Sequence, residues 1–575
     1  MSISNGTHAD GAPHEYVASR AYNLDGSRRR GFQLPALLLI LGAFVLPLSV
    51  ILWYSLHGFV YGAISGSPTI ANYTRIFSSA AYSWTLVRSI VFVAVVSAIT
   101  TVVAFPMAYY VAIHVRANRR IVFLALVIVP YLSSYLAKVI AWLALLGDTG
   151  IINTALMSSG IISTPISVLG IGQPAIILTF VYLCSPLAFM TLYSTLERID
   201  PDLFEATSDL GGRRWHIFWK VVLPLSRNGI LTTFAFVFVA MFGDYVTPVL
   251  IGGTDGVLFV NLLVNQFGAS MQWGFGSAMA IVMLFSSIVL FSGLRAVSGT
   301  VKGGEFTSRT VKPAALGLKV YVGAFVLFLY APISLLLLFA VNASPAVGLP
   351  ITGLSLKWFA AAFADQGFRE SFQNSLIIAT GSSLISTCFG TMASMSLAQS
   401  TGKRRTAVVA VLTAPMFMPP VILGIGILIA CSAAGVDRGI WVLMVSHALL
   451  SMPVAILIML ARLEGMSGNQ ELAAMDLGAT PWKTFVRVSL PQMMPALIAA
   501  LVLTFAFSLD EFILTFLVTG RTSTLPIFIF SSIRFQLSPS AIAAASVVML
   551  LSLSLIAVGA IAYNWRSLSR RGIEN

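Results

Sequence analysis

A short motif occurs twice in this chain of 575 residues, as Glu205-Ala-Thr-Ser-Asp-Leu-Gly211 and, 267 positions later, as Leu472-Ala-Ala-Met-Asp-Leu-Gly478. The match continues past the motif without a gap. A fixed offset between similar stretches indicates an internal repeat. We therefore predict that the chain is built from two related halves. Further matching pairs are Trp215 with Trp482, Phe218 with Phe485, Leu223-Pro224 with Leu490-Pro491, and Asp244 with Glu511.

The composition is that of a membrane protein. Hydrophobic residues make up 57% of the chain and charged residues 10%, against roughly 25% charged residues in soluble domains. A helix needs about 20 apolar residues to cross a membrane, and we count twelve such runs, six in each half. We therefore predict an all-α polytopic membrane protein of about twelve transmembrane helices, arranged as two parallel six-helix repeats. The predicted spans are Leu34–Leu56, Val87–Ile113, Ile121–Leu146, Ala175–Leu196, Ile230–Ile251, Ala278–Leu294, Val320–Val341, Ser375–Ala398, Ala407–Ala430, Gly439–Leu460, Ala496–Val518 and Ala541–Tyr563.

The two halves differ slightly in length. Arg88-Ser89 matches Asn374-Ser375 at an offset of 286 instead of 267, a difference of 19 residues. We place this insertion in the polar loop Gly147–Gln173. A basic, glycine-containing stretch separates the halves, as suits a linker. The predicted segments are a cytoplasmic tail at 1–30, a first half at 31–298, a cytoplasmic linker at 299–316 and a second half at 317–575.

The formal charge of +13 does not indicate nucleic-acid binding, because most Lys and Arg residues lie in alternate loops between the apolar runs. Basic loops mark the cytoplasmic side of a membrane protein, so both termini are predicted to be cytoplasmic. The polar first 30 residues make a cleaved signal unexpected. Cys184, Cys388 and Cys431 lie in or beside apolar spans. They predict neither a disulfide framework nor a metal site.

Each copy of the motif falls in a cytoplasmic loop between the fourth and fifth spans of its half. In the first copy, Asp200 is a good helix cap and Gly211 a helix end. In the second copy, Ser467 and Gln470 have the spacing of a capping box, and Gly478 ends the helix. Each loop is therefore predicted to form a helix-turn-helix on the membrane surface.

These loops resemble the EAA loop of type I ABC importer permeases, where the ATPase subunits dock. The first copy departs from that pattern because Thr207 replaces the second alanine. The second departs because Leu472 occupies the glutamate position and Glu471 comes one place earlier. If Glu471 projects from another helical face, the second docking contact is altered. The docking residues that the resemblance implies are Glu205, Ala206, Gly211, Glu471, Ala473 and Gly478.

The resemblance also implies the partners and the location. The chain lacks the G-x-x-x-x-G-K-[ST] phosphate loop, so ATP and Mg²⁺ are expected in a separate homodimeric ATPase. This chain is therefore expected to hold no cofactor and to be no enzyme. A periplasmic binding protein would supply the small-molecule substrate, and the chain would sit in a bacterial inner membrane. ATP would then drive alternating access by favouring one conformation over another.

Other stretches narrow the substrate class. Ser508–Gly520 and Phe535–Pro539 are similar to the second permease of spermidine/putrescine importers. Val129–Trp142 and Asp148–Asn153 are similar to the first permease of those systems. This resemblance implies import of a polyamine.

Several residues in or near the spans suit a cationic substrate. Carboxylates inside a membrane are costly and are functional candidates by default, and aromatic rings attract amines. In the alternative interpretation, the carboxylates form structural hydrogen bonds or pair with Lys138 or Arg521. His447 has no second histidine at helical spacing, so no metal site is predicted. The candidates for the translocation path are Asp244, Tyr245, Asp510, Glu511, Tyr131 and Trp142.

Two further alternatives remain open at this stage. The same architecture could import ferric iron, sulfate, phosphonates or opines. An ion-coupled secondary transporter could instead use the membrane carboxylates to carry protons, although the paired docking loops argue against it. An enzyme is disfavoured because no nucleophile, base and metal-ligand constellation is evident.

Overall fold

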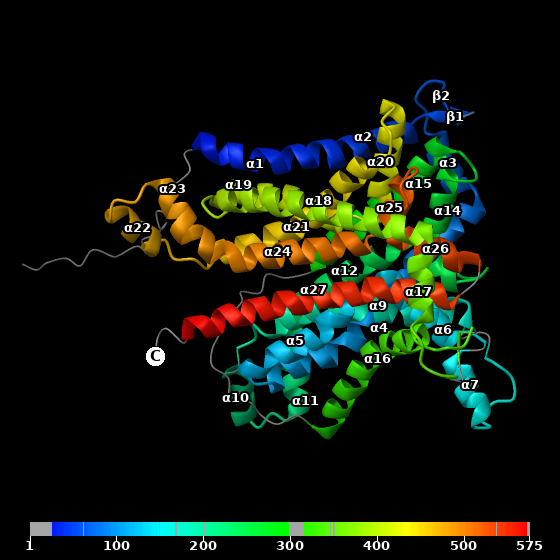
Figure 1. Ribbon diagram of the computed structural model, residues 1–575, viewed down its shortest axis with the longest axis horizontal. Coiled ribbons are helices and arrows are strands. Elements are labelled where there is room, and N and C mark those ends of the chain that lie inside the picture. Colours follow the sequence, from blue (N-terminus) through cyan, green and yellow to red (C-terminus); the bar gives the residue numbers. More distant parts are fainter. Residues whose placement is uncertain are drawn as a thin grey trace, which may run out of the picture.

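The computed structural model describes residues 26–60, 63–148, 150–166, 170–200, 202–297, 315–345, 347–348, 351–535 and 538–571. Most of the predicted tail at 1–30 and of the predicted linker at 299–316 lies outside these residues. The described chain is almost entirely helical, and its one two-stranded sheet is a short antiparallel hairpin. In Figure 1 the long helices run along the long axis of the molecule. The all-α prediction is confirmed.

The first half contains long helices joined by short ones. The long α4 and α9 are each longer than the membrane core requires. The helices and strands are α1 (Gly26–Ile40), η1 (Leu41–Val45), α2 (Leu46–Ser55), β1 (Gly58–Val60), β2 (Ala63–Ser65), α3 (Ala71–Ser78), α4 (Ala80–Tyr109), η2 (Tyr110–His114), α5 (Ala117–Tyr131), α6 (Tyr135–Leu146), α7 (Ile151–Ser158), α9 (Gln173–Leu196), α10 (Asp202–Asp209), α11 (Arg214–Ile217), η3 (Phe218–Val222), α12 (Leu223–Phe242), α13 (Val246–Ile251), α14 (Phe259–Phe267) and α15 (Trp273–Val297).

The second half repeats this order closely. The π-helices η3 and η5 begin at equivalent positions, directly after the short second helix of each repeated loop. The helices are α16 (Leu316–Ala340), α17 (Lys357–Ala364), α18 (Gln366–Leu397), α19 (Gly402–Thr413), η4 (Ala414–Phe417), α20 (Pro420–Ala434), α21 (Ile440–Glu464), α22 (Asn469–Asp476), α23 (Pro481–Thr484), η5 (Phe485–Ser489), α24 (Leu490–Asp510), α25 (Ile513–Val518), α26 (Leu525–Phe535) and α27 (Pro539–Arg571).

Among the described residues, ten helices are long and apolar enough to cross a membrane, and an eleventh is added if the bent pair α19 and α20 is one span. Each of the twelve predicted spans falls on helix, but four of them are broken. The predicted third spans divide into α5 and α6 and into α19 and α20, with a bend of 93° in the second case. The predicted fifth spans divide into α12 and α13 and into α24 and α25. The same two spans are therefore interrupted in each half.

A bundle of three helices forms the centre of each half. In the first half α4, α9 and α12 pack together, and in the second half α18, α21 and α24 do the same. The second bundle is held by small residues on one face of α18. Ser386 donates to the backbone oxygen of Ala448 at 3.1 Å, and Ser394 donates to that of Ile456 at 3.0 Å. Small residues let membrane helices approach closely enough for such bonds.

The first helix of each half packs against the other half. Helix α1 contacts α18, α19 and α21, whereas α16 contacts α4, α5 and α6. The buried amide of Gln33 in α1 donates to the hydroxyl of Ser396 in α18 at 2.9 Å, although the two residues are 363 positions apart. The two halves are thus interlocked by an exchange of helices.

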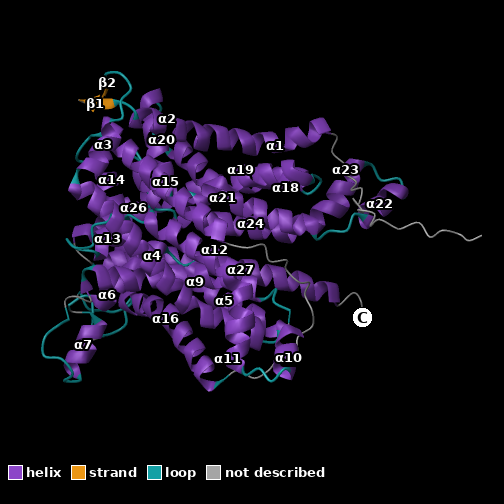
Figure 2. Ribbon diagram, turned by 180° about the vertical axis from the view of Figure 1, so that it is seen from behind, coloured by secondary structure: helices purple, strands orange, loops and turns teal. Residues whose placement is uncertain are grey.

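The ends of the molecule differ. Figures 1 and 2 show α10, α11, α22 and α23 at one end, together with the start of α1 and the end of α27. The hairpin β1–β2 and helices α3, α7 and α26 lie at the other end. Helix α7 falls within the predicted insertion Gly147–Gln173, while the equivalent connection in the second half runs only from Ala434 to Ile440.

Candidate functional site

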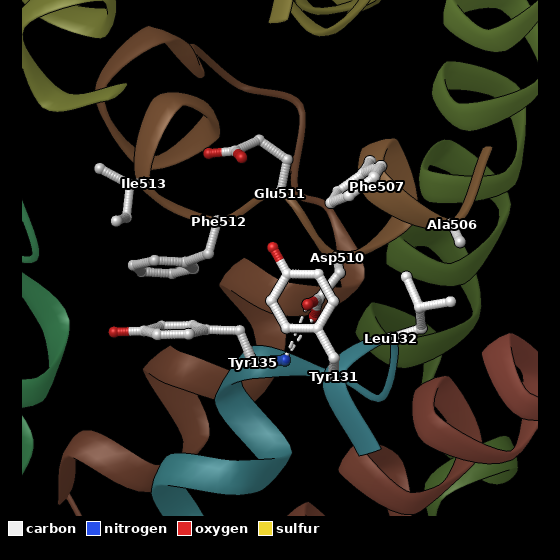
Figure 3. Close-up of a pocket in the computed structure, with 9 residues that line it drawn as sticks. All are labelled: Tyr131, Leu132, Tyr135, Ala506, Phe507, Asp510, Glu511, Phe512 and Ile513. Atoms are coloured by element: carbon white, nitrogen blue, oxygen red, sulfur yellow. Dashed lines mark hydrogen bonds between the residues drawn. The ribbon is translucent and has the colours of Figure 1, made fainter. Parts of the chain in front are cut away.

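A pocket lies where the broken third span of the first half meets the broken fifth span of the second half (Figure 3). Its cavity volume is about 180 Å³. The structure brings three of the predicted path residues together here, namely Tyr131, Asp510 and Glu511. The full lining is Tyr131, Leu132 and Tyr135 from the first half and Ala506, Phe507, Asp510, Glu511, Phe512 and Ile513 from the second half.

The first wall forms because the chain turns between α5 and α6. Helix α5 ends at Tyr131, one residue after Pro130, and α6 begins at Tyr135 with Ser134 as its cap. Proline and a serine cap favour a helix end followed by a new helix start. The break therefore leaves the first backbone N–H groups of α6 facing partners outside the helix.

One of those N–H groups meets a carboxylate of the other half. The backbone nitrogen of Tyr135 donates to both carboxylate oxygens of Asp510, each at 2.8 Å (Figure 3). The phenolic hydroxyl of Tyr135 donates to Asp244, at 2.8 and 2.7 Å from its two oxygens. Tyr135 thereby connects two of the predicted carboxylates, and it was not among the predicted residues.

Asp244 and Glu511 perform the same structural task in the two halves. Asp244 accepts from the backbone nitrogen of Thr247 at 3.0 Å, and Glu511 accepts from that of Leu514 at 3.0 Å. Each carboxylate thus caps the short helix that follows the break in its fifth span. The equivalence predicted from the repeat is borne out by this shared geometry.

The three carboxylates differ in how far a solute can reach them. Asp244 is only 5% exposed and also accepts from the backbone nitrogen of Val246 and from the hydroxyl of Thr247, both at 2.9 Å. It lies outside the pocket lining. Asp510 and Glu511 are partly exposed and line the pocket. Asp244 therefore fits the structural alternative, while Asp510 and Glu511 are open to a ligand.

Lys138 is buried close to this site. Its ammonium nitrogen donates to the backbone oxygen of Tyr131 at 2.9 Å and lies 5.8 Å from the centre of the Tyr131 ring. Across the part of the chain that the structure describes, the ion pairs are Arg120 with Glu197 and Arg405 with Glu464. The alternative in which Lys138 or Arg521 forms a salt bridge with these carboxylates is thus not what the described geometry shows.

The other two predicted aromatic residues lie outside the pocket lining. Trp142 belongs to an aromatic cluster, with its ring 5.4 Å from that of Tyr182 and 5.8 Å from that of Phe328. Tyr245 stacks on Phe516 at 5.5 Å, and Phe516 stacks on Phe512 at 5.5 Å. Tyr245 therefore reaches the pocket only through a row of rings. The rings that do line it besides the tyrosines, Phe507 and Phe512, were not predicted.

His447 packs between helices rather than beside other metal-ligand residues. Its two ring nitrogens lie 2.8 Å from the hydroxyl of Ser508 and 2.7 Å from that of Thr515. Within the described ranges, no cluster of three or more His, Cys, Asp or Glu residues is placed to hold a metal ion.

The two repeated loops form the predicted helix-turn-helix at one end of the molecule. Gly211 and Gly478 have φ angles of +77° and +86°, in the left-handed region that favours glycine. The next residue in each loop donates its N–H to a backbone oxygen five positions earlier, from Gly212 to Thr207 at 2.9 Å and from Ala479 to Ala474 at 3.0 Å. This pattern is a Schellman helix ending, and it is the same in both halves.

These loops expose large apolar side chains. Leu210 and its equivalent Leu477 are each 90% exposed. Trp215 and its equivalent Trp482 are 68% and 72% exposed. Exposed apolar groups of this size, repeated at one end of the molecule, are typical of a surface that another protein covers.

The two glutamates of the loops face in different directions. Glu205 is exposed, as are Ala206 and Ala473. Glu471 is 2% exposed and accepts a hydrogen bond of 2.6 Å from Ser489 in η5. The shift of this glutamate by one place therefore turns it inward, where it holds α22 against the start of the fifth span.

Comparison with known proteins identifies relatives of both halves. The family described as binding-protein-dependent transport system inner membrane component matches residues 102–302 and 386–567. The two matches correspond to the two halves defined by the repeat.

Individual relatives each match about two fifths of the chain. The spermidine/putrescine transport system permease protein PotB of Haemophilus influenzae is 31% identical over 229 residues, which cover 40% of this chain and 79% of PotB. The putrescine transport system permease protein PotI of Escherichia coli is 32% identical over 230 residues, which cover 39% of this chain and 82% of PotI. A crystal structure of a bacterial alginate ABC transporter with an alginate pentasaccharide-bound periplasmic protein covers 47% of this chain and 92% of the matched chain, with a TM-score of 0.40 and 12% identity.

Proposed function

Because this chain belongs to the family of binding-protein-dependent transport system inner membrane components, we propose that it forms the membrane path of an ATP-driven importer for a polyamine such as putrescine or spermidine. As a member of this family it is a multi-pass inner membrane permease. The substrate, the partners and the sidedness below are parts of the proposal.

The pocket between the halves is the observation on which the substrate class rests. Asp510 and Glu511 bring two carboxylates to one lining, and Tyr131, Phe507 and Phe512 bring rings. A protonated amine is attracted both by carboxylates and by ring faces. Removing the amine from water inside a membrane is costly unless such partners replace its hydration. An anion such as sulfate would instead meet two carboxylates.

The relatives favour the same class. PotB and PotI are named as permeases of spermidine/putrescine and putrescine systems, and each is at least 31% identical to this chain over most of its own length. Because the family covers both halves of one chain, a single polypeptide would supply the whole path.

We propose that an ATPase docks on the two repeated loops. The exposed Leu210 and Trp215, with their equivalents Leu477 and Trp482, give each ATPase subunit an apolar contact. ATP and Mg²⁺ would bind in that ATPase, and the loops would lie in the cytoplasm together with both ends of the chain. A periplasmic binding protein would deliver substrate to the opposite end of the molecule.

Transport would follow from a change in the angle between the halves. The hydrogen bond between Tyr135 and Asp510 crosses the boundary between the halves. Rocking of one half against the other would break or lengthen this bond and open the pocket to one side at a time. ATP can shift this equilibrium only if the ATPase binds the two conformations with different affinity.

Uptake by reconstituted vesicles tests the proposal. The vesicles contain this chain, the ATPase encoded beside it and the binding protein, and they receive labelled putrescine or spermidine with or without ATP. Accumulation that requires ATP is the expected result. ATP hydrolysis without polyamine uptake would overturn the substrate class while leaving the importer in place. Uptake driven by an ion gradient in the absence of ATP would instead favour a secondary transporter.

A further inference from the structure

A second and larger cavity opens at the end of the second half that carries the repeated loop. It is an apolar groove of about 710 Å³ between α1, α18 and α24. We call it the second-half groove and define it by Phe32, Cys388, Thr391, Met395, Phe485 and Met493, with Trp482 at its end toward the loop. It is separate from the pocket that contains Asp510, with which it shares no lining residue.

The first half closes the equivalent space with its own side chains. Positions 105 and 109 correspond to Thr391 and Met395 at the offset of 286, and they are Phe105 and Tyr109. The ring of Phe218, the equivalent of Phe485, meets Phe105 at 5.9 Å and Tyr109 at 6.2 Å, edge to face in both cases. The repeat therefore has two aromatic side chains in the first half where the second half has open space.

The surroundings of the groove identify the kind of occupant. Helix α18 is a candidate membrane span, and on it Leu384, another lining residue, is 55% exposed and Cys388 is also exposed. The groove thus opens on the surface that faces lipid. An empty apolar space in a well-packed protein forfeits contact energy, so a hydrocarbon chain from the bilayer would gain by filling it.

The end of the groove near the loop carries positive charge. Lys483 follows the lining residue Trp482, Arg487 lies two residues beyond Phe485, and Arg30 lies two residues before Phe32, and all three are exposed. Basic side chains beside a membrane surface attract anionic lipid headgroups. An apolar groove that ends in exposed basic residues matches the two parts of an anionic phospholipid.

We propose that the second-half groove binds one acyl chain of an anionic phospholipid, whose headgroup rests on Lys483, Arg487 and Arg30. Since Trp482 belongs both to the groove and to the second repeated loop, the lipid contacts that loop directly. The first loop has no such contact, because Phe105 and Tyr109 take the place of the lipid. Membrane composition would therefore act on one of the two loops only.

Photo-cross-linking tests this site in the full chain. The chain is placed in nanodiscs of phosphatidylcholine that contain phosphatidylglycerol with a diazirine on its acyl chain, and cross-linked peptides are identified by mass spectrometry. Cross-links are expected to be several-fold more frequent at residues 388–395 and 493–497 than at the equivalent residues 102–109 and 226–230. Equal labelling of the two halves would overturn the proposal.

The repeat supplies matched variants. Thr391→Phe with Met395→Tyr gives the second half the side chains of the first and is expected to abolish the excess labelling. Phe105→Thr with Tyr109→Met is expected to create labelling at residues 102–109. This reciprocal variant, together with the wild-type comparison, decides the question even if the filled variant does not fold. A filled variant that elutes as the wild type and keeps its labelling would contradict the proposal.

The charge requirement has its own test. Lys483→Gln with Arg487→Gln is expected to lower the preference for the phosphatidylglycerol probe over a phosphatidylcholine probe by roughly tenfold, because each basic residue near an anionic surface contributes to binding. An unchanged preference would exclude an anionic headgroup as the partner of these residues.

Discussion

Tyr135 and Asp510 lie 375 positions apart in the sequence, yet the backbone nitrogen of one donates to both carboxylate oxygens of the other at 2.8 Å. The bond joins the first turn of α6 in the first half to the last residue of α24 in the second. It ties the two halves together at the wall of the pocket. Because it uses a backbone donor, substitution of the Tyr135 side chain leaves it possible.

Asp510→Asn should reduce polyamine uptake while the protein still folds. The amide oxygen of asparagine can accept the N–H of Tyr135, but the negative charge that would face an amine is lost. Uptake is expected to fall by at least about tenfold, since a cation in a desolvated site depends strongly on its partner charge. The measurement is ATP-dependent uptake of labelled putrescine. Unchanged uptake would remove Asp510 from the path.

Tyr135→Phe should destabilise the protein, because it deprives the buried carboxylate of Asp244 of one donor. The expected cost is about 1–3 kcal/mol, typical of a buried polar group that loses a partner. Thermal unfolding of the purified chain measures this cost. The matched control is Tyr182→Phe, which removes a hydroxyl bonded to the backbone oxygen of Leu329 at 3.0 Å, away from the pocket. We expect both variants to lose stability but only the first to lose uptake.

Gly211→Val and Gly478→Val should prevent assembly with the ATPase. Both glycines have positive φ, where a side chain costs roughly 1–2 kcal/mol, and neither has a neighbouring atom that an added Cβ would meet. The damage would thus come from the backbone of the loop. Co-purification of the ATPase is the measurement. Gly435, with φ +65° at the end of α20, is the control, because its replacement by valine imposes similar strain away from the loops; a binding loss there as well would refute a specific role.

Glu205→Ala and Glu471→Ala should have different effects despite their similar places in the motif. Glu471 is buried and bonded to Ser489, so its loss is expected to lower stability by about 1–3 kcal/mol. Glu205 is exposed, so its loss is expected to leave the thermal midpoint nearly unchanged and to weaken ATPase binding. Unfolding and pull-down measurements on both variants check this, and identical behaviour would contradict the inward placement of Glu471.

Much of the fold could be predicted because hydropathy and the repeat report directly on spans and halves. The motif glycines also predicted the turn in each loop, since positive φ at a helix end is a strong local requirement. The breaks inside the third and fifth spans were not predicted. Apolar residues continue through them, and hydropathy does not record the direction of the backbone. Pro130 and Ser134 were the local signals for the first break.

The candidate site was predicted in part for a related reason. Charge inside an apolar span singled out Asp510 and Glu511, which line the pocket. The role of Tyr135 depends on a contact with a residue 375 positions away, which no local pattern reveals. Trp142 has the chemistry for binding an amine, but its ring packs with Tyr182 and Phe328 instead. Residue type can suggest a role, while the direction of a side chain depends on tertiary packing.

The exchange of first helices bears on how the protein is made. Helix α1 leaves the ribosome before any other span, but the partner of its buried Gln33 is Ser396, which is synthesised 363 residues later. During that interval α1 must wait in the bilayer with a polar amide that lacks its final hydrogen bond. Contacts so distant in sequence form slowly, so the order of synthesis sets the first helix to be inserted earliest and docked among the last. A chain that stalls in its second half would therefore present an unpaired first helix to the quality-control proteases of the membrane.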